Sequence, residues 1–313
     1  MQTTTMKDQQ ISSEDRRLIH RILLDFIILT LLCMPLIICE YIIEPFRRGF
    51  FCSDETIRYP FRDNTITLIM LALFVTLLPA IIVITVEYTH YYRCGRTKDT
   101  LLLFGRNVPV WIVEFFKHAS YYLFGALLTF NATELGKFTI GRLRPHFISV
   151  CQPQLADGST CDAPQNLYRY VEDYSCAGVG YTRDDVRQAR LSFPSGHSSL
   201  SFYAMIFLII YLQYKFTWRG SRFSRYFLQF SLLMLAWFTA LSRVIDNWHH
   251  WSDVLCGSLL GILGAVITAI FINKDFRTPL LQCLNANLPH QNSTNLKDSM
   301  ATLPSFTQRH EVA

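Results

Sequence analysis

Charged residues are scarce in this sequence. Only 17% of its 313 residues are Asp, Glu, Lys or Arg, while 50% are hydrophobic. A soluble protein of this length carries more charge, so the composition argues against a soluble enzyme and indicates a polytopic membrane protein. The sequence also lacks a basic block and zinc-finger spacing, so its net charge of +5 does not indicate binding to nucleic acid.

Two further absences concern the N-terminus and the domain organisation. The first apolar segment follows a polar lead of 18 residues and has no clear small-residue cleavage site, so we interpret it as an uncleaved anchor. No internal repeat is present, which favours a single domain. We expect a cytosolic lead over 1–18, one membrane domain over 19–275 and a disordered cytosolic tail over 276–313, because the chain end is rich in Asn, Gln, Ser and Thr.

Apolar segments of membrane-spanning length dominate what is present. A spanning helix needs about 20 apolar residues, and six segments meet or approach this length: 22–43, 66–86, 110–134, 198–214, 226–242 and 254–272. The predicted fold is therefore all-α, a six-transmembrane-helix bundle with a long outer loop, about 136–194, between the third and fourth helices. In the last helix, Gly257 and Gly261 allow close helix packing, either inside the bundle or in a dimer.

Basic residues predict the orientation. Lys and Arg are most frequent in the N-terminal flank, the second and fourth loops and the C-terminal flank, so both termini should be cytosolic. Four of the nine cysteines then face the extracellular or lumenal side, where disulfides form. Three pairings are open to them, and we expect at least one disulfide within or onto the third loop: Cys52, Cys151, Cys161 and Cys176.

Three short polar patches border apolar segments on the predicted outer face. They are KFTIGRLRP (137–145), PSGH (194–197) and SRVIDNWHHWSD (242–253). Cleavage of a phosphate ester needs positive donors around the phosphoryl oxygens, and the planar arginine fork suits that task. We expect Lys137, Arg144 and Arg243 to surround a phosphate, and on spacing Arg142 could serve as well as Arg144.

The second patch should begin the fourth helix. Gly196 permits close backbone approach to a phosphate, and the exposed amides of a helix N-terminus favour an anion. Ser195 can donate a hydrogen bond to a phosphoryl oxygen. His197 can give a proton to a leaving alkoxide, because histidine titrates near neutral pH.

The third patch contains a candidate nucleophile. His249 and Asp253 are four residues apart, so they share one face if the sixth helix has begun by His249. A carboxylate on one imidazole nitrogen aims the other, which can then form a covalent phosphoenzyme. His250 is an equal candidate on composition, and an interfacial Trp–His belt is the non-catalytic alternative. A zinc site made of these groups and His197 is disfavoured, since the nearby basic residues would repel a cation, so we expect no metal.

Taken together, the patches, as KxxxxxxRP, PSGH and SRxxxxxHxxxD, resemble the signature of the type 2 phosphatidic acid phosphatase superfamily. The segments FFCSDETIRYPF (50–61) and KFTWRG (215–220) are similar to those of animal lipid phosphate phosphatases, also called phospholipid phosphatases, and of their insect Wunen relatives. This resemblance implies a six-helix membrane enzyme that needs neither magnesium nor another cofactor. The implied substrates are phosphate monoesters such as phosphatidate, lysophosphatidate, sphingosine 1-phosphate and ceramide 1-phosphate.

The resemblance also implies a role for each motif residue. His249 would be the nucleophile, Asp253 its orienting partner and His197 the acid for the leaving group. The same motifs select His249 over His250 and Arg144 over Arg142. The phosphate would be held by five residues: Lys137, Arg144, Ser195, Gly196 and Arg243.

The same interpretation predicts binding partners and a cellular location. We expect a lipid phosphate substrate and membrane lipids as partners and no nucleic acid, with homo-oligomerisation left open. The active site should face the extracellular or lumenal side, in the plasma membrane or, alternatively, in endomembranes. Two other functions stay open: a lipid-phosphate binding or uptake protein without turnover, and a polyprenyl diphosphate phosphatase of the same fold.

Overall fold

Six long helices dominate the computed structural model, which describes residues 2–93, 100–103, 106–216, 221 and 223–286. They are α1 (Gln2–Tyr41), α2 (Leu68–Arg93), α3 (Val110–Ile140), α6 (Gly196–Lys215), α7 (Ser224–Ile245) and α8 (Trp251–Ala286). Five of them are long and apolar enough to cross a membrane, and α3 packs lengthwise among them although it is not one of the five. The chain is therefore an all-α polytopic membrane protein, as predicted.

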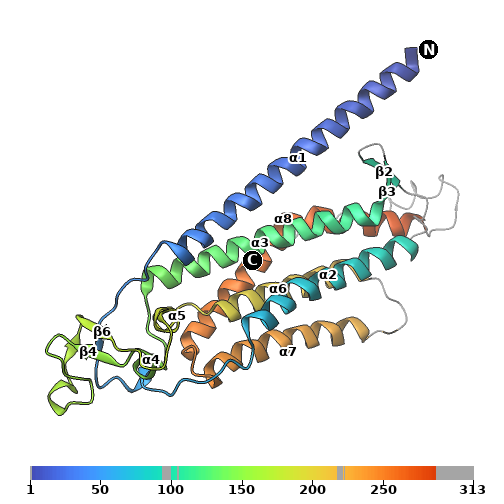
Figure 1. Ribbon diagram of the computed structural model, residues 1–313. Helices are drawn as coiled ribbons and strands as arrows, with labels where there is room; N and C mark the ends of the chain where they lie inside the picture. The colour runs from blue at the N-terminus through green and yellow to red at the C-terminus, as the bar shows by residue number, and fades with distance from the viewer. Residues whose placement is uncertain (1, 94–99, 104–105, 217–220, 222, 287–313) are drawn as a thin grey trace, which may run out of the picture.

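The central helix of the bundle is α6. It packs against α2, α3, α7 and α8, and it carries most of the fully buried large side chains, including Tyr203, Phe207 and Leu212. The outer helices instead direct large apolar side chains outward, as helices facing lipid do. The helix α1 packs mainly on α3 and diverges from the other helices toward its N-terminus (Figure 1).

Glycines set the close contact between α6 and α8. A side chain at Gly257 would collide with the Ser195 carbonyl, and one at Gly261 with the Ser199 carbonyl. These glycines therefore serve packing inside the bundle, one of the two roles predicted for them. The helix α8 continues to Ala286, past the predicted end of the membrane domain at residue 275. The rest of the predicted tail, 287–313, lies outside the described residues.

The long loop between α3 and α6 folds into a cap at one end of the bundle, together with the α1–α2 segment (Figure 1). Its elements are α4 (Phe147–Cys151), β4 (Pro153–Leu155), η2 (Pro164–Asn166), β5 (Tyr170–Val171), β6 (Tyr174–Cys176) and α5 (Arg183–Gln188). The α1–α2 segment contributes β1 (Phe50–Phe51) and η1 (Glu55–Ile57). Strand β1 pairs antiparallel with β5, and β4 with β6. A separate antiparallel pair, β2 (Thr100–Leu103) and β3 (Arg106–Pro109), lies at the opposite end of the bundle.

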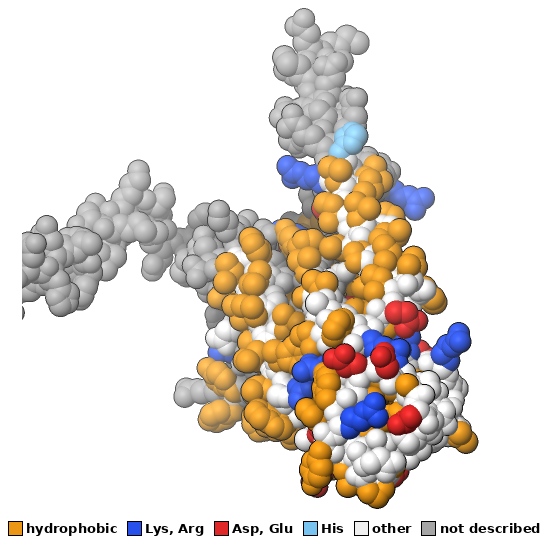
Figure 2. All heavy atoms as spheres, turned by 90° about the vertical axis from the view of Figure 1, so that its left-hand side faces the viewer, with side chains coloured by type: hydrophobic (Ala, Val, Ile, Leu, Met, Phe, Trp, Pro, Cys, Tyr) orange, Lys and Arg blue, Asp and Glu red, His pale blue; other side chains and the backbone are white. Residues whose placement is uncertain are grey.

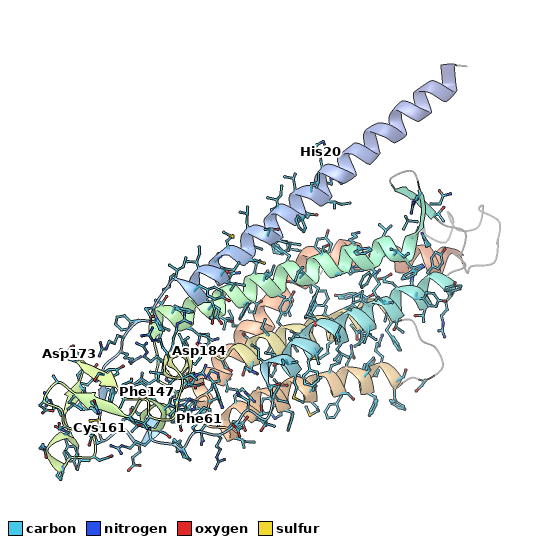
Figure 3. All side chains as sticks on the ribbon, in the orientation of Figure 1. His20, Phe61, Phe147, Cys161, Asp173 and Asp184 are labelled. Atoms are coloured by element: carbon cyan, nitrogen blue, oxygen red, sulfur yellow. A yellow bond between two sulfur atoms is a disulfide. The ribbon has the colours of Figure 1, made fainter. Side chains whose placement is uncertain are left out.

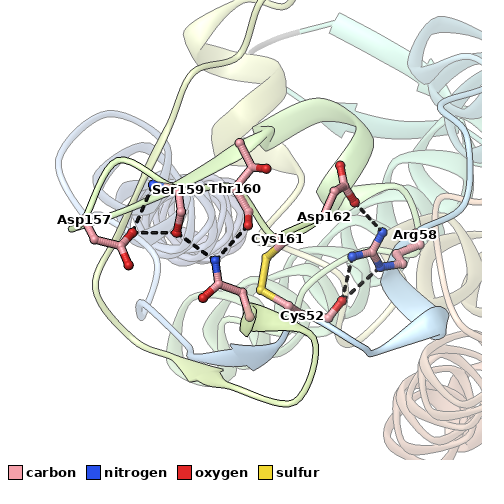
Figure 4. Close-up of a disulfide and its surroundings, with 8 residues drawn as sticks. Cys52, Arg58, Asp157, Ser159, Thr160, Cys161 and Asp162 are labelled. Carbon is pink, nitrogen blue, oxygen red and sulfur yellow. Dashed lines mark hydrogen bonds and ion pairs between the residues drawn. A yellow bond between two sulfur atoms is a disulfide. The ribbon is translucent and has the colours of Figure 1, made fainter. Parts of the chain in front are cut away.

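Two disulfides and a small apolar core hold the cap together. The bonds join Cys52 to Cys161 and Cys151 to Cys176, which confirms disulfides in and onto the third loop and selects one of the three pairings. Figure 4 shows the first bond, beside which Arg58 donates to the Cys52 carbonyl and pairs with Asp162. The apolar residues around both bonds include Phe50, Phe147, Val150 and Leu155.

Polar and apolar surfaces are separated along the molecule. In the view onto the cap end, Lys, Arg, Asp and Glu gather on the cap, while hydrophobic side chains cover the helices behind it (Figure 2). The cap residues Phe61, Phe147, Cys161, Asp173 and Asp184 cluster at this end, far from His20 on α1 (Figure 3). This distribution is what a bilayer around the helices and water around the cap require.

Candidate active site

The three sequence patches meet where the bundle joins the cap. The helix α3 ends, α6 begins, α7 ends and α8 begins at this same end of the bundle (Figure 1). Residues that are more than 100 positions apart therefore become neighbours: Arg142 Nη1 lies 2.5 Å from Asp253 Oδ1. The Ser195 amide donates to the Asp253 carbonyl at 3.1 Å, which joins the second patch to the third.

The first patch begins at the C-terminus of α3. Gly141 ends this helix in the left-handed conformation (φ 56°), and a side chain there would collide with the Phe46 carbonyl. In the last turn, Lys137 Nζ lies 2.7 Å from Glu134 Oε1. A Cβ added to Gly196 would lie 3.1 Å from Lys137 Nζ, so the glycine gives the ammonium its place beside the start of α6.

The protein makes hydrogen bonds to only one side of the Arg144 guanidinium. Its Nε and Nη2 donate to the Leu191 carbonyl, Nη2 also contacts the Gln188 side chain, and the group lies over the Trp248 ring at 4.6 Å. The remaining nitrogen, Nη1, is buried and has no hydrogen-bond partner in the protein. Burial lowers the pKa of Arg144 to about 9, which leaves it charged at neutral pH. This nitrogen is therefore available to an anion.

Arg142 has a different role from Arg144, although sequence spacing alone could not distinguish the two arginines. Its Nη1 contacts Asp253 Oδ1 at 2.5 Å and Ser252 Oγ at 2.8 Å. The ion pair neutralises a fully buried carboxylate, which would otherwise be costly to bury. Arg142 therefore supports the third patch, while Arg144 keeps a free donor.

The PSGH segment forms the N-terminus of α6, as predicted. Ser195 is the N-cap, and its Oγ accepts from the Ser198 amide at 3.4 Å and from Ser198 Oγ at 3.1 Å. Because it accepts in both contacts, its own hydroxyl proton is available to another acceptor. His197 Nε2 is buried without a partner, and Lys137, Arg144 and Arg243 are close enough to act on this imidazole.

Arg243 is fully buried near the end of α7 and is largely occupied by the protein. Its Nε and Nη2 donate to Ser242 Oγ, Nη2 also to Asp246 Oδ2 at 2.9 Å, and Nη1 to Asn64 Oδ1 at 2.7 Å. Of the five N–H groups of a guanidinium, this leaves one on Nη1. Arg243 can thus offer a phosphate its charge and a single donor, fewer contacts than its motif position led us to expect.

His249 precedes α8 rather than lying within it, since the helix begins at Trp251. Its Nδ1 is 2.7 Å from the Ser192 carbonyl but 4.0 Å from Asp253 Oδ2. The carboxylate is therefore near the imidazole, but it is not the direct hydrogen-bond partner that the four-residue spacing indicated. A carbonyl can only accept, so Nδ1 carries the proton and Nε2 the lone pair.

Electrostatics keep the His249 imidazole neutral. Burial, reinforced by the positive charges of Arg144 and Lys137, holds the pKa of His249 well below its usual range. The neighbouring His250 is directed elsewhere, with Nε2 3.1 Å from the Leu143 carbonyl. Within the described ranges, no three His, Cys, Asp or Glu side chains are grouped as metal ligands would be.

Sequence reasoning missed several residues that support the site. Glu134 within α3 and Asp246 at the end of α7 each lie three residues from their basic partners, Lys137 and Arg243, and that spacing could have identified them. Ser192 gives no such signal, because its partner His249 is 57 positions away.

Comparison with known proteins gives consistent matches. A model of the PAP2 superfamily matches residues 118–277, a range that includes every predicted site residue. A "Putative phosphatidate phosphatase" of Drosophila melanogaster is 42% identical over 271 residues, which cover 85% of this chain and 72% of that protein. Phospholipid phosphatase 1 of Rattus norvegicus is 35% identical over 299 residues, 96% of this chain and 98% of the relative. Phospholipid phosphatase 2 of Homo sapiens is 37% identical over 265 residues, 84% and 86% respectively. No solved structure matches the chain.

Proposed function

This chain belongs to the PAP2 superfamily and is a lipid phosphate phosphatase of the membrane, and from that premise we propose that it hydrolyses lipid phosphate monoesters through a phosphohistidine at His249. The proposed substrates are phosphatidate, lysophosphatidate, sphingosine 1-phosphate or ceramide 1-phosphate. The reaction needs no metal, because basic side chains take the place of a cation around the phosphoryl oxygens.

One observation supports this proposal above all. Two buried polar atoms without a partner, Arg144 Nη1 and His197 Nε2, come from different patches and converge on the neutral imidazole of His249. Buried polar groups without partners are rare in proteins and call for a specific explanation. A phosphate would accept from Arg144 Nη1 and, with His197 protonated, from its Nε2, and it would lie between a nucleophile and an acid.

The proposed reaction has two steps. In the first, His249 Nε2 attacks phosphorus, the N–P bond forms, the P–O bond to the lipid breaks and His197 gives its proton to the leaving alkoxide. In the second, water attacks the phosphohistidine, His197 takes a proton from this water, and the N–P bond breaks to release inorganic phosphate. Lys137, Arg144, Ser195 and the amide of Gly196 would hold the phosphoryl oxygens in both steps, with Arg243 adding its charge and one donor.

A direct assay tests the proposed function. The full chain, purified in detergent with EDTA present, should release phosphate from lysophosphatidate micelles, and labelled phosphate should be trapped on His249. His249→Ala should abolish release while its expression and thermal unfolding stay like those of wild type. His20→Ala, a change at an exposed histidine on α1, is the matched control. Binding of lysophosphatidate without release would instead establish a binding or uptake protein.

Substrate choice needs its own measurement. A panel of the four monoesters and a polyprenyl diphosphate, assayed with EDTA, would rank them by kcat/KM. A clear preference for the diphosphate would replace the monoester proposal with the polyprenyl alternative.

We further propose that the site faces the extracellular or lumenal side, with both termini in the cytosol. The two cap disulfides support this side, since such bonds persist in oxidising compartments. Intact cells that carry the protein in the plasma membrane should hydrolyse lysophosphatidate added to the medium. Activity that appears only after permeabilisation would place the enzyme in endomembranes or its site on the cytosolic side.

A further inference from the structure

Ser192 is bound to the catalytic patches through all three of its polar groups. It is fully buried. Its amide donates to the Arg142 carbonyl at 2.9 Å, its Oγ donates to Asp253 Oδ2 at 2.6 Å, and its carbonyl lies 2.7 Å from His249 Nδ1. No other described residue joins the first patch, the carboxylate and the imidazole in this way.

The remaining contacts of Asp253 explain why the connection is indirect. Oδ1 accepts from Arg142, while Oδ2 accepts from Ser192 Oγ and from the His250 amide at 3.1 Å. With these partners in place, the carboxylate stays 4.0 Å from His249 Nδ1. The nitrogen of the imidazole that must be oriented is bound to a backbone carbonyl instead.

From this geometry we propose that Ser192 is the positioning residue for the nucleophile, and that Asp253 acts on His249 through Ser192 rather than by direct contact. Arg142 completes the connection by fixing the carboxylate. This inference rests on the proposed function in taking His249 as the nucleophile. It assigns a role to two residues, Ser192 and Arg142, outside the eight that the motifs selected.

A neutral carbonyl and a carboxylate have different effects on an imidazole. A carboxylate bound to Nδ1 would stabilise the protonated ring and raise its pKa, whereas a carbonyl aims the ring with a weaker effect on the pKa. The charged or titratable groups around His249 include its neighbour His250 and groups from every element that packs there: Lys137 on α3, Arg144 after it, His197 on α6, Arg243 on α7, and Asp253 on α8 with its partner Arg142. Most of these groups are cationic, and the charge of Asp253 is offset by Arg142, so their combined effect also favours a neutral nucleophile.

Removal of the serine hydroxyl tests this arrangement. In Ser192→Ala, Asp253 Oδ2 loses its closest partner and can turn toward Nδ1. We expect the acidic limb of the kcat–pH profile to move upward by about one pH unit, and phosphoenzyme formation at neutral pH to slow by about 10- to 100-fold, with KM within twofold of wild type. Ser192→Thr keeps the hydroxyl and should retain the wild-type profile. Ser120→Ala, at an exposed serine on α3, is the matched control.

Double substitution separates positioning from packing. In Ser192→Ala combined with Asp253→Asn, the acidic limb should return to the wild-type position, because no carboxylate remains to stabilise the imidazolium. Equal losses in Ser192→Ala and Ser192→Thr with unshifted profiles would mean that Ser192 only fills space. An unchanged Ser192→Ala enzyme would show that the Ser192 hydroxyl does not connect Asp253 to His249. Either result would overturn the proposal.

A second measurement is independent of turnover. Nitrogen NMR of histidine-labelled protein, with His249 assigned by His249→Gln, reports which ring nitrogen carries the proton and the pKa of the ring. We expect the Nδ1–H form in wild type and a higher pKa in Ser192→Ala. If the wild type shows this form but no phosphate release, the proposed function fails, while the orientation of the His249 ring by Ser192 stands. The Nε2–H form in wild type would overturn the positioning role even in an active enzyme.

Discussion

At the residue scale, Arg144 divides its guanidinium between the protein and the pocket. Nε and Nη2 are used by Leu191 and Gln188, and Nη1 is free. A lysine has the same charge but cannot satisfy both sides at once. We expect Arg144→Lys to lower kcat/KM for lysophosphatidate by about 100-fold, the usual cost of losing one donor to a transition state. Arg48→Lys, at an exposed arginine before the cap, should have no effect, and a nearly active Arg144→Lys would remove this residue from the phosphate site.

Individual residues also show how much of the candidate site could be predicted from the sequence. Residue types that chemistry demands at fixed spacing were predictable, and Lys137, Arg144, His197 and His249 do converge. Whether Arg142 or Arg144 keeps a free donor depends on which one meets Asp253, a contact between positions 111 apart. No local pattern encodes such a contact, so the spacing left both arginines open.

At the element scale, the contact between α6 and α8 sets the distance between the second and third patches. The backbones approach so closely at Gly261 that an added methyl group would meet the Ser199 carbonyl. We expect Gly261→Ala to destabilise the protein by about 1–3 kcal/mol, as overpacking generally does, and to reduce turnover because Ser195 and Asp253 move apart. Thermal unfolding and phosphate release in detergent measure the two effects. Leu259→Phe adds bulk on the exposed side of α8 and should change neither, and a wild-type Gly261→Ala would show that the helices can separate freely.

The cap makes a second prediction at this scale. The bond between Cys52 and Cys161 closes a loop of 109 residues that contains α2 and α3. Removing a native disulfide usually costs about 2–5 kcal/mol, and long loops favour a large value. Cys52→Ser combined with Cys161→Ser should therefore lower the unfolding midpoint clearly, while Cys256→Ser, at a free exposed cysteine on α8, should not. Equal midpoints in all three proteins would contradict a stabilising role for this bond.

Elements differ in how well sequence predicts them. The apolar runs predicted the long helices, because a bilayer imposes both length and composition on each segment. The cap was predictable only as a long outer loop, since its strands are two or three residues long and their partners are distant. Disulfides could be expected because the cysteines lie on the predicted outer side of the membrane, but only the folded structure selects one of the three possible pairings.

At the scale of the whole molecule, buried imidazoles make stability depend on pH. Burial lowers the pKa of His146 to about 4, and burial also lowers the pKa of His249 and of His250. An unfolded histidine titrates near 6.5, so between about 4 and 6.5 the unfolded chain binds more protons than the folded chain. Their contribution to stability is therefore fully present above pH 6.5 and is lost as the pH falls toward 4.

We expect the unfolding midpoint to be steady from pH 7 to 8 and to fall below pH 6.5. His146 alone should account for a loss on the order of 3 kcal/mol across its window. His146→Gln should lose less stability over this range, and its remaining slope reports the other buried imidazoles. Thermal unfolding in detergent at half-unit pH steps measures both slopes. If the unfolding midpoint falls equally steeply with pH in wild type and in His146→Gln, His146 takes up its proton as readily in the folded protein as in the unfolded chain.

The glycine contact between α6 and α8 has a consequence for the membrane around the enzyme. Bilayers differ in thickness between organelles, and a spanning helix adapts by changing its tilt. Because the backbones of α6 and α8 are in contact at Gly257 and Gly261, we expect both helices to tilt as one body and to keep the hydrogen bond from the Ser195 amide to the Asp253 carbonyl. Hydrophobic mismatch should then alter how the protein sits in its lipid while leaving the chemistry alone, so that one active site can serve thin and thick membranes alike.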